Sequence, residues 1–254
     1  MRHSKERHLL TAQLALTLTL TLLLPVLAHA QQQPSEPGWP QPVENDRSFG
    51  YAALNQNELR VGSPHSYRWE GEGWYGDDFN RLWLKSEGST DTSSGGADEA
   101  EVQGLYSRAV SAFFNLQGGV RYDFDPTSRG WAAFGIEGLA PLNWDIEAFA
   151  FVSSGGHLGA RFAGYYDLYL TQRLILQPQF ELNGYSRPDR AAMLGTGLAD
   201  GDFGLRLRYE LRREFAPYIG VTYQARFGAT AEMARAAALS AGDLRFAAGI
   251  RVWL

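Results

Sequence analysis

The 254-residue chain contains no cysteine. This excludes structural disulfides, thiolate metal sites and a lipid-modified N-terminal cysteine. It is consistent with secretion into an oxidising periplasm. Beyond the first 30 residues no run approaches the roughly 18 apolar residues that a membrane-spanning helix needs. If the mature protein lies in a membrane, it must therefore cross as strands.

The chain also lacks a large net charge. The formal net charge is −5, and no basic cluster occurs in the mature chain. Both observations argue against nucleic acid as a partner.

The N-terminus carries the pattern of a secretory signal peptide. Arg2, Lys5 and Arg7 precede an apolar stretch rich in Leu, and Ala28-His29-Ala30 forms a cleavage site. We expect a signal peptide over residues 1–30. The alternative, a helical anchor, is disfavoured by the cleavage site and by Pro25. Residues 31–50 are rich in Pro, Gln and Glu, which predicts a disordered periplasmic arm.

The rest of the chain alternates with a period of two, which is the period of a β-strand. Phe114, Leu116 and Val120 share one parity, while Gln117 and Arg121 share the other. Most of the segments have the 9–11 residues that a tilted strand needs to cross a bilayer. We predict about twelve strands, of which the first alternates poorly: 52–61, 66–75, 79–88, 99–108, 113–124, 131–139, 144–153, 157–168, 174–185, 201–211, 216–227 and 243–254.

The connections between these segments alternate between short and long. Short ones lie near residues 76–78, 109–112, 140–143, 169–173 and 212–215. Longer ones include 88–98, 186–200 and 228–242. This sorting is typical of an outer-membrane barrel, with short periplasmic turns and longer external loops. The fold class predicted is all-β: a transmembrane antiparallel up-and-down barrel over residues 51–254, with both termini periplasmic if the strand number is even.

Periodicity alone leaves inside and outside interchangeable, so a soluble barrel with an apolar interior is the alternative. The signal peptide, the sorted loops and the apolar last strand favour the membrane barrel. Aromatic and aliphatic stripes would then face lipid, and charged side chains would line the lumen. We expect Glu101 to face Arg121 and Arg161 to face Glu181 across neighbouring strands. Such pairs can form a structural network that fills a narrow barrel, or a charged path for cations.

Several long strings resemble the copper resistance protein B family. They run from Asp78 to Gly88 (DFNRLWLKSEG), from Trp131 to Pro141 (WAAFGIEGLAP), from Tyr166 to Pro178 (YDLYLTQRLILQP) and from Gly204 to Val221 (GLRLRYELRREFAPYIGV). The resemblance covers about Tyr51 to Leu254. It implies a bacterial outer-membrane barrel linked to copper tolerance, with copper ions and periplasmic copper-handling proteins as partners. Many family members carry a Met- and His-rich segment before the barrel. This chain has neither residue between Gln31 and Pro64.

The candidate copper ligands are therefore few. Thioether and imidazole ligands suit copper, and the mature chain offers His65, His157, Met193 and Met233, all in or next to external loops. Three carboxylates, Glu137, Asp145 and Glu147, are expected to point inward near one periplasmic turn. Each of the seven has a plain structural alternative as a loop, packing or ion-paired residue.

Two functions follow. The first is a copper-tolerance barrel that binds copper or assists its export from the periplasm. The alternative is a small structural or channel-forming barrel without copper binding. We expect no enzymatic activity, because Ser153 or Ser154 near His157 is the one candidate pair and no third catalytic group is evident. Outer-membrane lipid is the expected surrounding, and the barrel is expected to be a monomer.

Overall fold

The computed structural model describes residues 47–92 and 97–254. The predicted signal peptide over 1–30 and nearly all of the predicted arm over 31–50 lie outside the described residues. Among the described residues, no helix has the length and apolarity to span a membrane.

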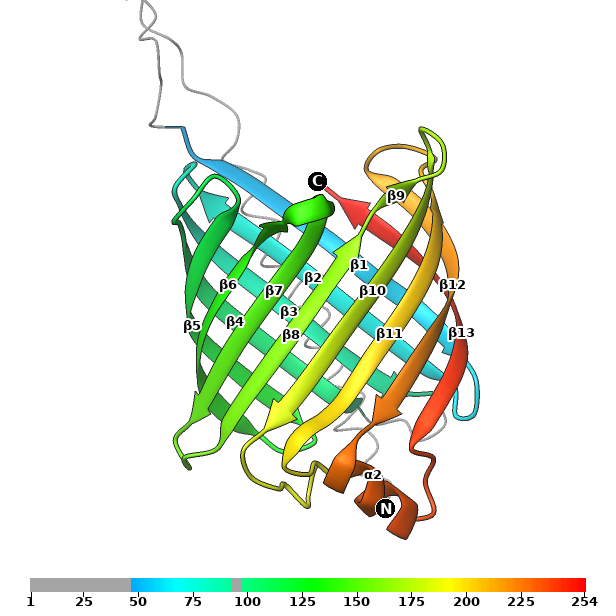
Figure 1. Cartoon of the computed structure of the whole chain (residues 1–254). Helices are drawn as coiled ribbons and strands as arrows, with labels where there is room; N and C mark the ends of the chain where they lie inside the picture. Colours follow the sequence, from blue (N-terminus) through cyan, green and yellow to red (C-terminus); the bar gives the residue numbers. More distant parts are fainter. Residues whose placement is uncertain (1–46, 93–96) are drawn as a thin grey trace, which may run out of the picture.

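Strands make up most of the described chain (Figure 1). The first six are β1 (Phe49–Val61), β2 (Ser66–Gly76), β3 (Asn80–Asp91), β4 (Ala97–Ala109), β5 (Phe114–Asp125) and β6 (Arg129–Ala140). They are followed by β7 (Trp144–Ser153), β8 (Leu158–Tyr166), β9 (Leu168–Tyr169), β10 (Leu174–Tyr185), β11 (Gly197–Tyr209), β12 (Phe215–Arg226) and β13 (Gly242–Trp253). Two short helices, η1 (Pro141–Asn143) and α2 (Gly228–Ala236), lie between strands.

The sheet closes on itself. Each strand pairs antiparallel with its neighbours in the chain, and β13 pairs with β1. The two-residue β9 follows β8 after Asp167 and pairs with the same neighbour, β10, so β8 and β9 together form one interrupted strand. The result is a closed barrel of twelve antiparallel strands, as the alternation predicted.

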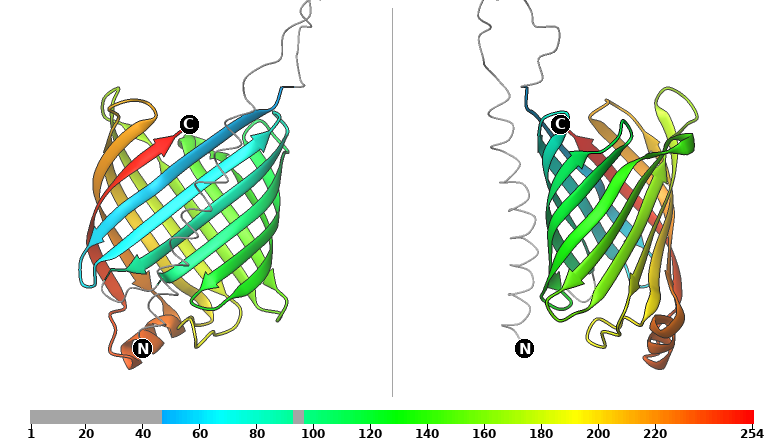
Figure 2. Two further views of the ribbon diagram at one scale, coloured as in Figure 1. Left: turned by 180° about the vertical axis from the view of Figure 1, so that it is seen from behind. Right: turned by 60° about the vertical axis from the view of Figure 1, so that its left-hand side comes forward.

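The two ends of the barrel differ. At one end, which we call the turn end, all connections are short, and η1 and the C-terminus also lie there; the connections 62–65, 126–128 and 154–157 at the other end are short as well (Figure 1). The segments 186–196 and 227–241 lie at the opposite end, which we call the loop end, and the second of them contains α2 (Figures 1 and 2). Gly195 N donates a hydrogen bond to Thr230 Oγ1 (2.8 Å), which joins these two loops.

Three turns at the turn end share one hydrogen-bond pattern. A side-chain oxygen of Asp77, Ser111 or Thr171 accepts hydrogen bonds from backbone N–H groups two and three residues later. The distances from Asp77 Oδ1 to the Phe79 and Asn80 nitrogens are 2.7 and 2.6 Å. Such Asx and Ser/Thr turns satisfy the backbone donors of a tight reversal. These bonds also lower the pKa of the Asp77 carboxyl below its ordinary value.

The apolar faces of the strands point outward. Val120 and Phe246 are 65% and 69% exposed, whereas Arg60 and Arg206 are 1% and 2% exposed. A continuous apolar exterior around a charged interior is the inverse of a water-soluble protein and requires lipid outside. The structure therefore excludes the soluble alternative.

The expectation that aromatic side chains face the lipid is wrong in part. Not all aromatic side chains face outward, because Trp83, Trp131, Phe149 and Phe151 are buried inside the barrel with Leu105 and Ala133. They lie on the lumen wall formed by β3 to β7. Charged side chains of the lumen, among them Lys85 and Arg121, stack against these rings.

The poor alternation of the first strand has a structural cause. A β-bulge lies between Leu54 and Gln56 in the pairing of β1 with β2. One extra residue shifts the parity of everything that follows it. Gln56, Glu58 and Arg60 consequently face the lumen.

Candidate functional site

Ion pairs centred on Arg161 cross the lumen. Its guanidinium forms a two-point pair with Glu101 of β4, in which both N–O distances are 3.0 Å. It also pairs with Glu87, and its Nε lies 3.5 Å from Glu181 Oε1. Arg161 therefore joins β8 to β3, β4 and β10 through one side chain.

Two further arginines extend this network. Arg68 Nη2 lies 2.8 Å from Glu181 Oε2 and 3.7 Å from Glu87 Oε2. Arg121 Nη2 lies 2.6 Å from Glu101 Oε2. This network separates two cavities of the lumen, one toward each end of the barrel. We call it the partition; its members are Arg68, Glu87, Glu101, Arg121, Arg161 and Glu181.

A second charged cluster lies beside the partition, because Glu58 is the cross-strand partner of Arg68 and Asp202 is that of Glu181. Glu58 accepts hydrogen bonds from Arg206 (2.7 and 2.8 Å), from Arg60 (2.7 Å) and from the Tyr218 hydroxyl (3.0 Å). Arg60 also pairs with Asp202. Glu58, Arg60 and Arg206 are almost completely buried. Because buried charges are tolerated only when they are paired, this cluster is a structural element of the barrel.

The turn-end cavity has a volume of about 260 Å³. Seven carboxylates and two basic side chains line it, together with neutral residues. The carboxylates are Glu70, Glu72, Glu87, Glu137, Asp145, Glu147 and Glu181. The potential in this cavity favours cations.

Lys85 lies in a cradle of carboxylates and rings. Its Nζ is 2.9 Å from Glu137 Oε2 and 2.5 Å from Glu147 Oε2. The same ammonium lies 5.3 Å from the ring centre of Trp83 and 5.5 Å from that of Phe149, which is the geometry of a cation–π contact. The cradle shows that this wall of the lumen accommodates a positive charge.

A glycine allows this arrangement. Gly135 is the cross-strand partner of Phe149, and a Cβ at this position would lie 2.6 Å from the Phe149 ring. Glycine at position 135 therefore leaves room for the Phe149 ring beside β6. The ring can then reach the Lys85 ammonium.

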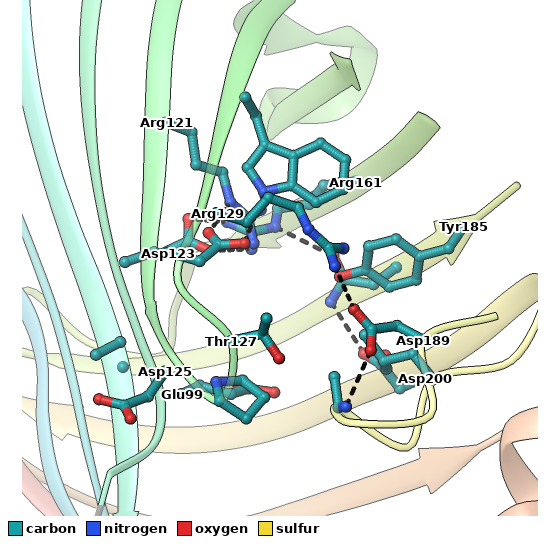
Figure 3. A pocket seen from close by; sticks show the side chains of 18 of the residues that line it. Glu99, Arg121, Asp123, Asp125, Thr127, Arg129, Arg161, Tyr185, Asp189 and Asp200 are labelled. Carbon is teal, nitrogen blue, oxygen red and sulfur yellow. Dashed lines mark hydrogen bonds and ion pairs between the residues drawn. The ribbon is translucent and has the colours of Figure 1, made fainter. Parts of the chain in front are cut away.

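The loop-end cavity is smaller, about 80 Å³, and is lined by eight carboxylates and five arginines (Figure 3). Arg129 donates a hydrogen bond to Asp189 Oδ2 (2.7 Å) and so ties the 186–196 loop to β6, as Figure 3 shows. Burial raises the pKa of Asp189. The bonds from Arg129 and from the Ala191 and Ala192 backbone outweigh burial, so the pKa lies below its ordinary value of 3.8.

The seven candidate ligands lie at opposite ends of the barrel. Glu137, Asp145 and Glu147 line the turn-end cavity. At the loop end, His157 lines the other cavity, and Met193 and Met233 lie in the 186–196 loop and in α2. His65 is exposed in the 62–65 loop, where its Nδ1 accepts a hydrogen bond from Gly62 N (3.3 Å). Within residues 47–92 and 97–254, no three His, Cys, Asp or Glu side chains are grouped to hold a metal ion.

The two expected ion pairs form, but not between directly opposed residues. Glu101 lies opposite Asp123, and Arg121 lies opposite Gln103. Arg161 likewise lies opposite Asn183, and Glu181 opposite Ala163. The register is therefore two residues away from the expected one. Long arginine side chains reach their partners diagonally.

Sequence reasoning missed Lys85 and the buried Glu58 cluster. Lys85 forms ion pairs with both Glu137 and Glu147. Lys85 shares its parity with Trp83 and Glu87 in the predicted strand 79–88, and this could have placed it in the lumen. Glu58 and Arg60 could not have been placed without the bulge.

These features define a class. A closed twelve-stranded barrel with an apolar exterior and a charged lumen is an outer-membrane β-barrel. A solved structure with a similar fold is that of the NanC porin, with a TM-score of 0.54 and 15% sequence identity, covering 79% of this chain and 98% of the porin chain. At this identity the likeness supports the fold alone.

The chain belongs to the copper resistance protein B family. The family model described as copper resistance protein B precursor (CopB) matches residues 48–254. Copper resistance protein B of Escherichia coli is 46% identical over 212 residues, which cover 82% of this chain and 71% of the relative. The copper resistance protein B homolog of Pseudomonas syringae pv. tomato is 45% identical over 186 residues, covering 73% of this chain and 63% of the relative.

Proposed function

We propose that the barrel contributes to copper tolerance by taking copper cations into its acidic lumen, where it binds them or assists their export from the periplasm. Membership of the copper resistance protein B family supports the link to copper. Carboxylates outnumber basic side chains in the lining of both cavities, and this observation is the main support for copper binding in the lumen.

The proposal includes an orientation. Short turns face the periplasm and longer loops face outward in outer-membrane barrels. The turn end would then be periplasmic, with both ends of the barrel chain on that side. Copper from the periplasm would meet the larger, more acidic cavity first.

Passage through the lumen would require the partition to rearrange. Glu87, Arg161 and Glu181 line both cavities, so the ion pairs of Arg161 stand between them. A buried, multiply paired arginine is costly to separate from its partners. This favours binding or controlled passage over a permanently open pore.

We propose no catalytic role. In the described part of the chain, the hydrogen bond between the Ser153 side chain and His157 runs from the backbone N–H of His157 to Ser153 Oγ (3.2 Å) and does not involve the imidazole. A backbone donor cannot act as the base that activates a serine.

The alternative function is a structural or channel-forming barrel without copper binding. It is favoured by the way ion pairs fill the lumen and by the lack of a grouped metal-ligand set among the described residues. In that case the charged lumen would only stabilise a narrow barrel.

Deletion of the gene followed by complementation separates the two. We expect the deletion strain to be more sensitive to copper, and the wild-type gene to restore growth. A double Glu72→Gln, Asp145→Asn variant should restore growth less well, while Glu232→Gln, at an exposed residue of α2, should restore it fully. Copper sensitivity unchanged by deletion would favour the alternative.

A further inference from the structure

Three carboxylates in the turn-end cavity accept hydrogen bonds from neutral donors. Glu70 accepts a hydrogen bond from Gln56 (2.5 Å), Glu72 from Asn55 (2.9 Å) and Asp145 from the Tyr165 hydroxyl (3.0 Å). All of these donors are neutral. Among the described residues, none of the three carboxylates has an ion-pair partner. The cavity is left with negative charge that Lys85 does not neutralise.

An orphaned acceptor lies in the same cavity. Gln103 lines it, is 2% exposed, and is the direct cross-strand partner of Lys85. Its Nε2 donates to Glu101 Oε1 (2.7 Å), whereas its Oε1 has no donor within the described part of the chain. A buried carbonyl oxygen without a donor is unfavourable. It marks a place where a ligand that carries donors would be stabilised.

The arrangement of these groups favours a hydrated cation over a bare metal ion. No three carboxylates or imidazoles among residues 47–92 and 97–254 are grouped to coordinate a bare metal ion. The cavity volume of about 260 Å³ is larger than that of six waters at about 30 Å³ each. Coordinated waters are hydrogen-bond donors, which matches a wall made of acceptors.

We propose that the turn-end cavity binds a divalent metal cation that keeps its water shell. The coordinated waters donate to Glu70, Glu72, Asp145 and the amide oxygen of Gln103. Lys85 is the neighbouring positive charge that limits affinity and so permits release. The inference deepens the proposed function, since it states how copper would be held, and for that reason it rests on it.

Hexaamminecobalt(III) is the probe that tests outer-sphere binding. Its ammine ligands do not exchange, and they present N–H donors much as coordinated waters present O–H donors. Titration of the purified protein in detergent, followed by calorimetry, should show saturable binding. Glu72→Gln and Asp145→Asn should each weaken this binding about tenfold, and Lys85→Met should strengthen it by a similar factor, as expected for one unit charge at close range. Glu232→Gln should leave the affinity unchanged.

Circular dichroism and the heat-dependent gel mobility of each variant establish that it is folded. Glu72→Gln is the safest variant, because the Asn55 donor still meets an oxygen acceptor. Absence of hexaamminecobalt binding, or binding equally weakened by Glu232→Gln, would overturn the inference. Tighter binding of putrescine than of hexaamminecobalt would also overturn it, since the cavity would then select an alkylammonium.

The result is separable from the proposed function. If copper binds but hexaamminecobalt does not, the cation enters direct coordination and only the inference fails. If hexaamminecobalt binds while deletion leaves copper tolerance unchanged, the cavity holds a hydrated cation and the copper role fails.

Discussion

Arg161 on β8 and Glu101 on β4 form a two-point ion pair across the lumen, with both N–O distances at 3.0 Å. Strands β5, β6 and β7 lie between them in the sheet. The pair therefore braces opposite parts of the wall instead of joining neighbours. Its position between the two cavities links the stability of the barrel to the permeability of its lumen.

Arg161→Ala should both destabilise the barrel and open the lumen. Removing the guanidinium leaves Glu87 and Glu101 beside one another with Arg68 and Arg121 as their remaining basic partners. The loss should therefore be at most the roughly 3–5 kcal/mol that breaking a buried pair costs. We expect a lower unfolding temperature and a higher single-channel conductance in planar bilayers. Arg161→Lys should be intermediate, because it keeps the charge and loses the two-point geometry.

The exposed Arg212 at the turn end provides the control. Arg212→Ala should change neither quantity. An Arg161→Ala barrel with wild-type stability and conductance would show that the partition does not separate the cavities.

Glu58→Gln should be among the most destabilising single substitutions. Glu58 is 1% exposed and pairs with both Arg60 and Arg206. Its loss leaves two buried guanidinium groups with Asp202 as their remaining carboxylate, at a cost of about 3–5 kcal/mol. Urea unfolding in lipid vesicles measures the change. A loss below about 1 kcal/mol would mean that water reaches this cluster.

A charged side chain on the outward face should destabilise the barrel more in the middle of the bilayer than near its surface. Val120 lies in the middle of β5 and is 65% exposed, whereas Leu142 lies in η1 at the turn end and is 83% exposed. Val120→Arg should cost about 2–4 kcal/mol and Leu142→Arg about 0–1 kcal/mol. Folding titrations into vesicles provide both values. Equal costs at the two sites would contradict a bilayer around the strands.

The Asp189–Arg129 pair should make the 186–196 loop sensitive to acid. The folded-state pKa of Asp189 lies below its ordinary value of 3.8. The stabilisation is therefore fully present above about pH 4 to 5 and is lost as the pH falls through the lowered pKa. Hydrogen exchange at Ala191 and Ala192, whose N–H groups bond to Asp189, should lose protection over that range.

Asp189→Asn provides the matched variant. At neutral pH its Ala191 and Ala192 N–H groups should exchange as fast as those of the wild type do at low pH. Trypsin should also cleave it faster after Arg190. Protection that is independent of pH in the wild type would show that the loop is held by other contacts.

The fold could be predicted because alternation is a local property. The twelve predicted segments correspond to the twelve strands, with β8 and β9 counted as one. The closed barrel is confirmed on this basis. The helix α2 was missed because the sequence GATAEMARA lies in a segment read only as a long loop, although Ala, Glu, Met and Arg favour helices.

The site was harder to predict because it depends on register. Alternation tells which face a residue occupies but not which residue lies beside it. Arg161 therefore faced the lumen as predicted, while its partners Glu87 and Glu101 come from distant strands. The meeting of Lys85 with Glu137 and Glu147 likewise depends on the closure of the barrel.

The central claim, that the acidic lumen accepts copper, is tested most directly by titrating the purified protein in detergent with Cu(II), and with Cu(I) under reducing conditions. We predict saturable binding in the micromolar range that is weakened about a hundredfold by the double Glu72→Gln, Asp145→Asn variant, about tenfold for each carboxylate removed, and is unchanged by Glu232→Gln. Binding of neither oxidation state at micromolar concentration, or identical binding by the folded double variant, would contradict the account.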